Sequence, residues 1–241
     1  MIRSFLAAFT LLTVVPAGKF CPSAEEVRRS ITFFPLVGLA LGALFYGIGL
    51  IVGDGFTAVA LLTLLPEFCT KGFHLDGLAD TADGFLSGRD RERKLEIMRD
   101  SRIGTMGVLA VVALLLAKFA ALRDLEAAGL AAGLMLLNGR VGVLFHIATS
   151  RYARPDGLGK IWFDGAKPWA GMALGLALSF GLGWRFAGTA GLAAAGAAVI
   201  FPVLWSLVTR RVIGGATGDT VGACEEMTEL VTLWVLLARQ F

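Results

Sequence analysis

The sequence predicts an all-α, multi-pass membrane protein built as one helical bundle. Hydrophobic residues make up 56% and charged residues 17% of the 241 residues, whereas a soluble domain carries about 25% charged residues. Several apolar segments approach or exceed the ~20 residues that a helix needs to cross a bilayer. Lys and Arg are concentrated in alternate connections between these segments. We therefore expect one membrane domain over residues 1–241, with about six to seven transmembrane helices and a short N-terminal helix.

The hydrophobic segments give the helices in order. The segment 5–16 is too short to cross a membrane comfortably, so we expect it to lie in the interface or to re-enter. We expect spans at 31–53, 56–70, 104–122, 127–149, 169–186, 189–209 and 220–238. The segment 56–70 is also short and runs into a polar sequence. It is therefore expected to continue as a helix into or beyond the interface.

The connections predict the orientation of these spans. Most of the 22 Lys and Arg residues lie in 16–30, 71–103, 150–168 and 210–219. The turns between the other span ends hold only Arg123, with Arg185 just inside its span. Because basic residues accumulate in short cytoplasmic loops, the loops near 71–103, 150–168 and 210–219 are expected to face the cytoplasm.

A row of carboxylates follows the short span. Asp76, Asp80 and Asp83 are spaced by four and three residues, which places them on one face of a helix. Like charges at this spacing repel, so a cation should face them. Mg²⁺ prefers oxygen ligands and commonly uses one or two carboxylates with substrate phosphates. The alternative is a solvated acidic face. His74, just upstream, is either part of the site or an interfacial histidine with an ordinary hydrogen bond.

A second acidic group lies in the last span. Asp219, Glu226 and Glu229 interrupt an otherwise apolar segment, and ionisable residues inside a span mark a functional interior by default. Asp219 could instead cap the helix N-terminus. Glu225 is expected to point elsewhere.

Basic residues could balance these acids. Arg99 and Arg102 precede a predicted helix start around Ser101, Gly104 and Thr105, where free N–H groups favour a phosphate. The alternative is that these arginines only fix the orientation in the membrane. The charge run at 89–94 is expected to be solvated.

Two cations lie within spans. Arg140 is too deep to reach the interface, so it should pair with Glu226, Glu229 or a substrate phosphate. Lys118 is nearer a span end and is interpreted as extending to the interface. The loop 150–168 is either a substrate-covering segment or an ordinary interfacial loop.

These residues suit phosphoryl transfer at a membrane face. Metal ions would bridge phosphate oxygens while a carboxylate accepts a proton from the attacking hydroxyl. The pattern does not name the alcohol or the leaving nucleotide.

Five sequence blocks resemble the cobalamin synthase family, adenosylcobinamide-GDP ribazoletransferase, in matching order. They are FFPLVGLALG at 33–42, GFHLDGLADTADG at 72–84, LEIMRDSRIGTMG at 95–107, RYARPDGLG at 151–159 and GGATGDTVGACEEMTELV at 214–231. The resemblance implies an inner-membrane enzyme of vitamin B12 synthesis. It would join adenosylcobinamide-GDP to α-ribazole, or to its 5′-phosphate, with release of GMP and with Mg²⁺ as cofactor.

The resemblance places the site on named residues. The family's acidic motifs fall on Asp76, Asp80 and Asp83 and on Asp219, Glu226 and Glu229. We expect Mg²⁺ to be held by Asp76, Asp80, Asp83, Glu226 and Glu229. We expect the substrates to be bound by His74, Arg99, Asp100, Ser101, Arg102, Arg140 and Thr220. Asp80, Asp83 and Asp219 are the expected catalytic residues, and the general base stays open between Asp83 and Asp219.

Two other functions stay open. One is a membrane enzyme like the CDP-alcohol phosphotransferases, although their sequence pattern is not reproduced here. The other is a cation-coupled transporter whose buried carboxylates form an ion pathway. The net charge of +3 is too small to indicate a nucleic-acid partner. Membrane lipid is an expected partner. A homo-oligomer and an association with other corrinoid-assembly enzymes also stay open.

Overall fold

The structure, a computed structural model, describes residues 1–16, 20–165 and 168–240. Over these residues all regular structure is helical, apart from one isolated bridge between Tyr152 and Ala216. The elements are α1 (Ile2–Leu12), α2 (Ala24–Ser30), η1 (Ile31–Phe33), α3 (Phe34–Val52), α4 (Phe56–Cys69), α5 (Phe73–Phe85), α6 (Arg91–Ile97), α7 (Thr105–Asp124), α8 (Ala128–Thr149), η2 (Leu158–Trp162), α9 (Trp169–Ile213) and α10 (Gly218–Ala238). The predicted all-α class is confirmed.

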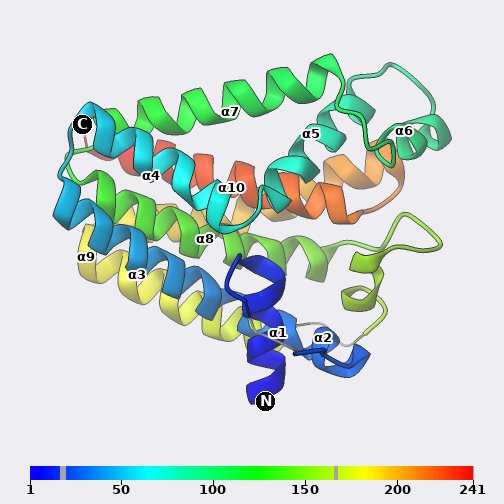
Figure 1. Cartoon of the computed structure of the whole chain (residues 1–241), viewed down its shortest axis with the longest axis horizontal. Helices are drawn as coiled ribbons and strands as arrows, with labels where there is room; N and C mark the ends of the chain where they lie inside the picture. Colours follow the sequence, from blue (N-terminus) through cyan, green and yellow to red (C-terminus); the bar gives the residue numbers. More distant parts are fainter. Residues whose placement is uncertain (17–19, 166–167, 241) are drawn as a thin grey trace.

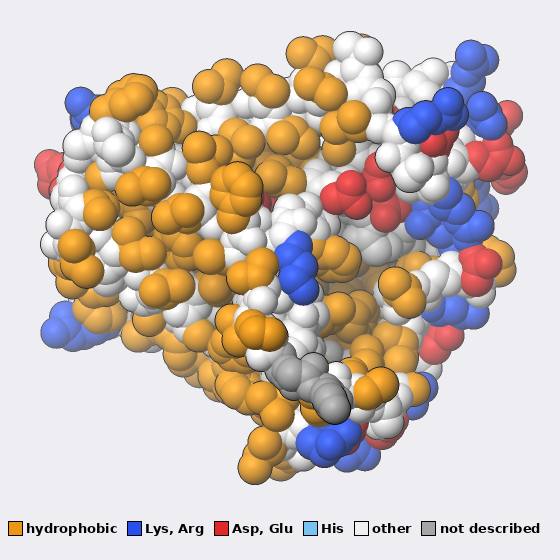
Figure 2. Space-filling view, viewed as in Figure 1, with side chains coloured by type: hydrophobic (Ala, Val, Ile, Leu, Met, Phe, Trp, Pro, Cys, Tyr) orange, Lys and Arg blue, Asp and Glu red, His pale blue; other side chains and the backbone are white. Residues whose placement is uncertain are grey.

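Helix α8 forms the centre of the bundle. It is buried along nearly its whole length, and it packs against α3, α9 and α10 (Figure 1). The outward faces of the surrounding helices expose large apolar side chains such as Leu109 and Leu116 on α7 and Ile200 and Leu204 on α9. Hydrophobic side chains cover most of the face shown in Figure 2. This apolar exterior is typical of a surface that contacts lipid.

Glycines bring α3 and α8 into backbone contact. A Cβ on Gly42 would lie 2.5 Å from the carbonyl oxygen of Gly133, and a Cβ on Gly49 would lie 2.5 Å from Cα of Gly129. In lipid, helix association depends on close packing of small residues, because burial from water supplies no driving force there. These four glycines therefore hold the α3–α8 pair together.

Helix α9 consists of two antiparallel arms. Its backbone breaks at Gly188, where φ is 55° and ψ is −133°. Ser179 of the first arm bonds to Asn138 of α8, while Ser206 of the second arm bonds to His146. The two arms therefore flank α8 in opposite directions, and the expected spans 169–186 and 189–209 are both present.

In the part of the chain that the structure describes, four helices are long and apolar enough to cross a membrane, or five when the bent pair α4 and α5 counts as one span. The two arms of α9 lie within one of these helices. Helix α10 is 21 residues long but carries several acidic side chains. Each expected span thus corresponds to a helix or an arm.

The helix that should continue beyond residue 70 is broken instead. Helices α4 and α5 meet at 88°, with Lys71 and Gly72 in the left-handed region at φ of 60° and 63°. Glycine tolerates this region, whereas lysine does so at a cost. The expectation of a continuous helix is therefore wrong. The segment 5–16 does form a short helix, α1, which packs against α2.

The long connections lie together at one end of the bundle, at the right of Figure 1. We call this the loop end, formed by 86–104, the described part of 150–168, and 214–217. Charged side chains gather there (Figure 2). The short turns around Gly53, Leu125 and Gly188 lie at the opposite end. Residues 166–167 of the expected cytoplasmic loop lie outside the described part.

Candidate active site

Four aspartates lie near one another at the loop end, and we call them the acidic cluster: Asp76, Asp80, Asp83 and Asp219. The first three lie on α5, and Asp219 lies in the first turn of α10. Gly77 allows the two helices to touch, since a Cβ there would lie 2.7 Å from the carbonyl oxygen of Asp219. The structure thus brings the first acidic row together with Asp219.

Arg154 supplies a positive charge to the acidic cluster. Its guanidinium lies 2.9 Å from Asp219, and its side chain is only 9% exposed. Arg154 is not among the residues predicted from the sequence, because a loop arginine has no periodicity that reveals the direction of its side chain. The block RYARPDGLG at 151–159 was the available signal.

Asp219 does not cap α10. Thr217 is the N-cap, and it forms a capping box with Thr220. The Thr217 hydroxyl also donates to Asp219 at 3.2 Å. The N-cap interpretation of Asp219 is therefore wrong. Thr220 is fully buried and its hydroxyl bonds to Thr217, so the structure gives its side chain a role in the helix start rather than at a substrate surface.

Asp80 lies in the middle of the acidic cluster. It is half-buried and lies one helical turn before Asp83, which binds the start of α7 at the loop end. Burial raises its pKa to about 7, with further contributions from Asp76, Asp219 and Asp83, while Arg154 acts in the opposite direction. A carboxyl group with this surplus of negative neighbours favours a bound cation.

Asp83 binds the N-terminus of α7. Its two carboxylate oxygens accept hydrogen bonds from the backbone N–H groups of Gly104, at 2.6 Å, and Gly107, at 2.8 Å. The sequence predicts a phosphate site at this helix start. The prediction is corrected for these two N–H groups, because the carboxylate of Asp83 is the anion they bind.

The segment before α7 is exposed. Arg99 pairs with Asp156, and Arg102 pairs with Asp100 at 2.7 Å. A pocket of about 180 Å³ is lined by Asp83, Asp100 and Arg102 among others. Substrate binding by Arg99, Asp100, Ser101 and Arg102 remains a prediction.

Deeper in the bundle lies a second set of charges, the buried network of Glu67, Glu225, Glu226, Glu229, Lys118 and Arg140. Lys118 lies 2.6 Å from Glu226, 2.7 Å from Glu229 and 3.2 Å from Glu67. Arg140 pairs with Glu229 and Glu225. The expected pairing of Arg140 with Glu229 is thus present.

Two expectations about this network are wrong. Lys118 does not extend to the interface: it is 0% exposed and pairs with three glutamates. Glu225 does not point away, since it is buried against Arg140 and His74. Sequence position alone gives the depth of a lysine but not the partners on other helices.

His74 belongs to the buried network rather than to the surface. It is 3% exposed, and its Nδ1 lies 3.2 Å from Glu225. Among the described residues that nitrogen has no hydrogen-bond partner. An interfacial histidine with an ordinary hydrogen bond is therefore not what the structure has, and the ring is buried away from a substrate-accessible surface.

Among the described residues, two sets of side chains in the buried network bring three possible ligand atoms within reach of one metal ion. The oxygens of Glu67, Glu226 and Glu229 lie within 4.8 Å of one another, as do ligand atoms of His74, Glu225 and Glu226. However, Lys118 and Arg140 already neutralise part of that charge, and Glu226 lies about 10 Å along α10 from Asp219. The described carboxylate oxygens of the acidic cluster are not gathered as closely, but they form an all-oxygen donor set in which Asp76 is exposed and Arg154 pairs with Asp219. Its donor chemistry therefore fits Mg²⁺ better.

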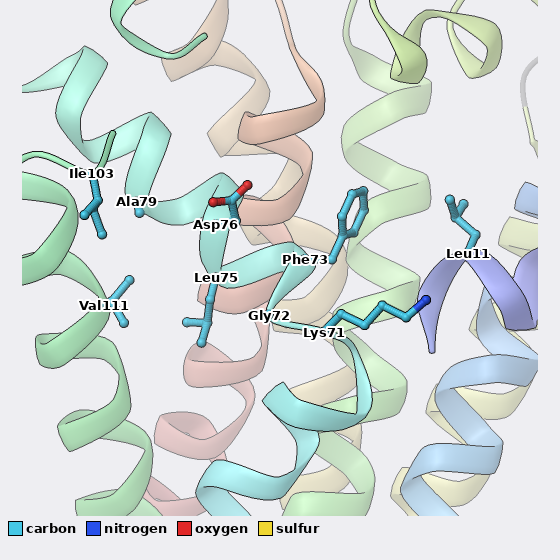
Figure 3. A pocket seen from close by; sticks show the side chains of 9 residues that line it. All are labelled: Leu11, Lys71, Gly72, Phe73, Leu75, Asp76, Ala79, Ile103 and Val111. Carbon is cyan, nitrogen blue, oxygen red and sulfur yellow. The ribbon is translucent and has the colours of Figure 1, made fainter. Parts of the chain in front are cut away.

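A pocket of about 420 Å³ opens beside the acidic cluster. Figure 3 shows Asp76 at its wall, with Phe73 and Lys71 between Asp76 and Leu11 of α1. Ile103 and Val111 form the opposite side. A candidate metal ligand thus borders a space that a small molecule could enter.

Comparison with known proteins decides the family. The family model for cobalamin-5-phosphate synthase matches residues 4–237. The chain belongs to this family. It is 40% identical to an adenosylcobinamide-GDP ribazoletransferase of Klebsiella pneumoniae subsp. pneumoniae, over 98% of this chain and 100% of the relative. The same coverage applies to ribazoletransferases of another K. pneumoniae strain, at 39%, and of Escherichia coli O139:H28, at 38%. No solved structure matches the chain.

Proposed function

We propose that this protein is an adenosylcobinamide-GDP ribazoletransferase. It transfers the cobinamide-phosphate group of adenosylcobinamide-GDP to α-ribazole or α-ribazole 5′-phosphate and releases GMP. Family membership and the relatives' names support this reaction. The observation that carries it is the acidic cluster, which gathers Asp76, Asp80 and Asp219 beside Arg154 at the loop end.

The transfer is one in-line displacement at phosphorus. The 3′-hydroxyl oxygen of the ribazole ribose bonds to the cobinamide-side phosphorus, while the bond from that phosphorus to the bridging oxygen breaks. The bridging oxygen leaves on GMP, and the hydroxyl proton passes to a carboxylate. Because phosphoryl transfer needs positioning and charge stabilisation above all, the groups that hold the diphosphate decide the rate.

The carboxylates divide these tasks. Asp76 and Asp80 are the ligands we assign to Mg²⁺, which when bound neutralises charge on the diphosphate. Asp83 places both oxygens on the start of α7, so we assign it a positioning role. Asp219 is the general base: its Oδ2 accepts a hydrogen bond from Thr217 and pairs with Arg154, while no described residue donates to its Oδ1, which can take the hydroxyl proton.

We place the protein in the cell inner membrane with the loop end facing the cytoplasm. The concentration of basic residues at the loop end supports this orientation. The nucleotide substrate and the GMP product would then stay on the side where nucleotides are made.

The test uses detergent-purified full chain with adenosylcobinamide-GDP and α-ribazole, with and without Mg²⁺. GMP and the corrinoid product are followed by chromatography. Metal-dependent GMP release matched by cobalamin formation is the expected result. Folded protein that remains silent both in detergent and in lipid vesicles would overturn the proposal.

A further inference from the structure

The pocket in Figure 3 combines an apolar wall with two charged side chains of opposite sign. Ile103 and Val111 form part of the apolar wall, and the Phe73 side chain is about half exposed. The charged groups are Asp76, which belongs to the acidic cluster, and Lys71. A ligand here meets a carboxylate at one edge and an ammonium group at another.

Lys71 is held over this pocket by the bend between α4 and α5. Its φ of 60° places a side chain with a Cβ in the left-handed region, a conformation that persists only where the surroundings fix it. Its N–H donates to Phe68, and that of Gly72 donates to Glu67 at 2.8 Å. The Lys71 side chain extends along the pocket toward Leu11 (Figure 3). Its ammonium group forms no hydrogen bond or ion pair with any described residue.

The pocket volume selects between the two substrates of the proposed function. At about 420 Å³ it falls within the ~300–1,000 Å³ of small-molecule sites. A nucleoside with a fused aromatic base fits such a space, whereas a corrin macrocycle bearing a nucleotide is far larger. The apolar wall and Phe73 suit an aromatic base, because aromatic rings favour stacked or edge-to-face contacts.

We propose that this pocket binds the ribazole substrate, and that Lys71 recognises its 5′-phosphate. The base lies against Phe73 and the apolar wall, the ribose hydroxyls lie toward Asp76, and the phosphate pairs with the Lys71 ammonium. This rests on the proposed function and adds a specificity residue to it. Lys71 therefore sets the preference for α-ribazole 5′-phosphate over α-ribazole.

The test compares kcat/KM for these two acceptors in the purified full chain. The variant Lys71→Met removes the charge and keeps a long apolar side chain, Lys71→Arg keeps the charge, and Lys160→Met is a matched control outside the pocket. We expect Lys71→Met to lower the ratio of phosphate to unphosphorylated acceptor by about tenfold, the effect of one charge-assisted contact. We expect Lys71→Arg and Lys160→Met to leave it near the wild-type value. Inorganic phosphate should compete with the phosphorylated acceptor in wild type and not in Lys71→Met.

Two outcomes would overturn the proposal. An unchanged ratio in folded Lys71→Met is one. The other is a variant whose activity changes between phosphatidylcholine and phosphatidylglycerol nanodiscs while the acceptor ratio stays constant, because Lys71 then binds a lipid headgroup phosphate. If wild type releases no GMP with either acceptor, the proposed function fails. Equilibrium binding of α-ribazole 5′-phosphate to wild type and to Lys71→Met then tests the role of Lys71 independently of turnover. Equal binding by the two proteins would overturn the proposal.

Discussion

The acidic cluster and the buried network contain similar acidic groups in different surroundings. In the acidic cluster, four aspartates lie at the loop end, where Arg154 pairs with Asp219 and Asp76 is exposed. In the buried network, four glutamates are interlocked with Lys118 and Arg140 inside the bundle. A carboxylate with accessible, uncompensated charge can receive a metal and a substrate, whereas one that is paired and enclosed holds helices together. The difference indicates that chemistry belongs to the first and stability to the second.

Neutralising Asp80, at the centre of the acidic cluster, is the most direct test of whether the chemistry belongs to this cluster. We expect Asp80→Ala to lower kcat/KM by about a thousandfold, because it removes electrostatic support for the transferred phosphoryl group. The thermal midpoint in detergent should stay close to that of wild type. The control is Glu92→Ala on the exposed helix α6. Full activity in Asp80→Ala would show that the acidic cluster is not the metal site.

In the buried network we expect substitutions to lower stability rather than activity. Lys118→Ala leaves Glu226 and Glu229 without their shared cation, and breaking a buried ion pair costs about 3–5 kcal/mol. We expect a large loss of folded protein and a lowered thermal midpoint in detergent. Glu229→Gln should also lower the midpoint while the surviving folded fraction keeps its Mg²⁺ dependence. A Glu229→Gln variant that has normal stability but no longer responds to Mg²⁺ would show that the metal binds in the buried network.

Removal of the metal tests whether activity depends on Mg²⁺ bound at the acidic cluster. Chelation should abolish turnover, and added Mg²⁺ should restore it. Because the pKa of Asp80 is raised to about 7, protons compete with the metal below that pH. The apparent Mg²⁺ affinity should fall by about tenfold per pH unit below pH 7 and level off above it. Mg²⁺ titrations of activity at pH 6, 7 and 8 test this, with Asp80→Asn as the control that flattens the dependence. A pH-independent affinity in wild type would argue against Asp80 as a ligand.

The smallest expected effect separates Asp83 from its neighbours on α5. Asp83→Ala removes the acceptor for Gly104 and Gly107, and loss of a helix cap costs about 1–2 kcal/mol. We expect a modest drop in the thermal midpoint together with reduced activity. Ser101→Ala in the same segment serves as the control and should leave the midpoint unchanged. Loss of activity in Asp83→Ala without any change in midpoint would instead assign Asp83 to the chemistry directly.

Hydropathy and residue spacing are sufficient to predict the apolar helices and the shared face of the acidic row. The spans follow from segment length and apolarity, and the shared face of Asp76, Asp80 and Asp83 follows from the helical period. These features are local, so they can be read along one stretch of chain. The pairing of Arg140 with Glu229 was also accessible, because a deep arginine requires an acidic partner.

Features that depend on contacts between helices were not accessible. The position of Lys118 in the sequence does not indicate its glutamate partners. The hydrogen bonds from the α7 N-terminus to Asp83 depend on where α5 lies relative to α7. The 88° bend at Lys71 and Gly72 was missed because lysine rarely adopts a positive φ. Arg154 lies in a loop, where direction has no periodic signal. Each of these is decided by tertiary packing rather than by local preference.

The glycine contacts between α3 and α8 have a consequence for mutational tolerance. At Gly42 or Gly133 even a methyl group would collide with backbone atoms of the opposite helix, as it would at Gly49 or Gly129. A saturation mutagenesis scan should therefore find these positions as intolerant as the aspartates, although they perform no chemistry. A map of mutational tolerance would therefore show two groups of intolerant positions, these glycines and the aspartates of the acidic cluster. Only a measurement of turnover per folded molecule would reveal which of them is the active site.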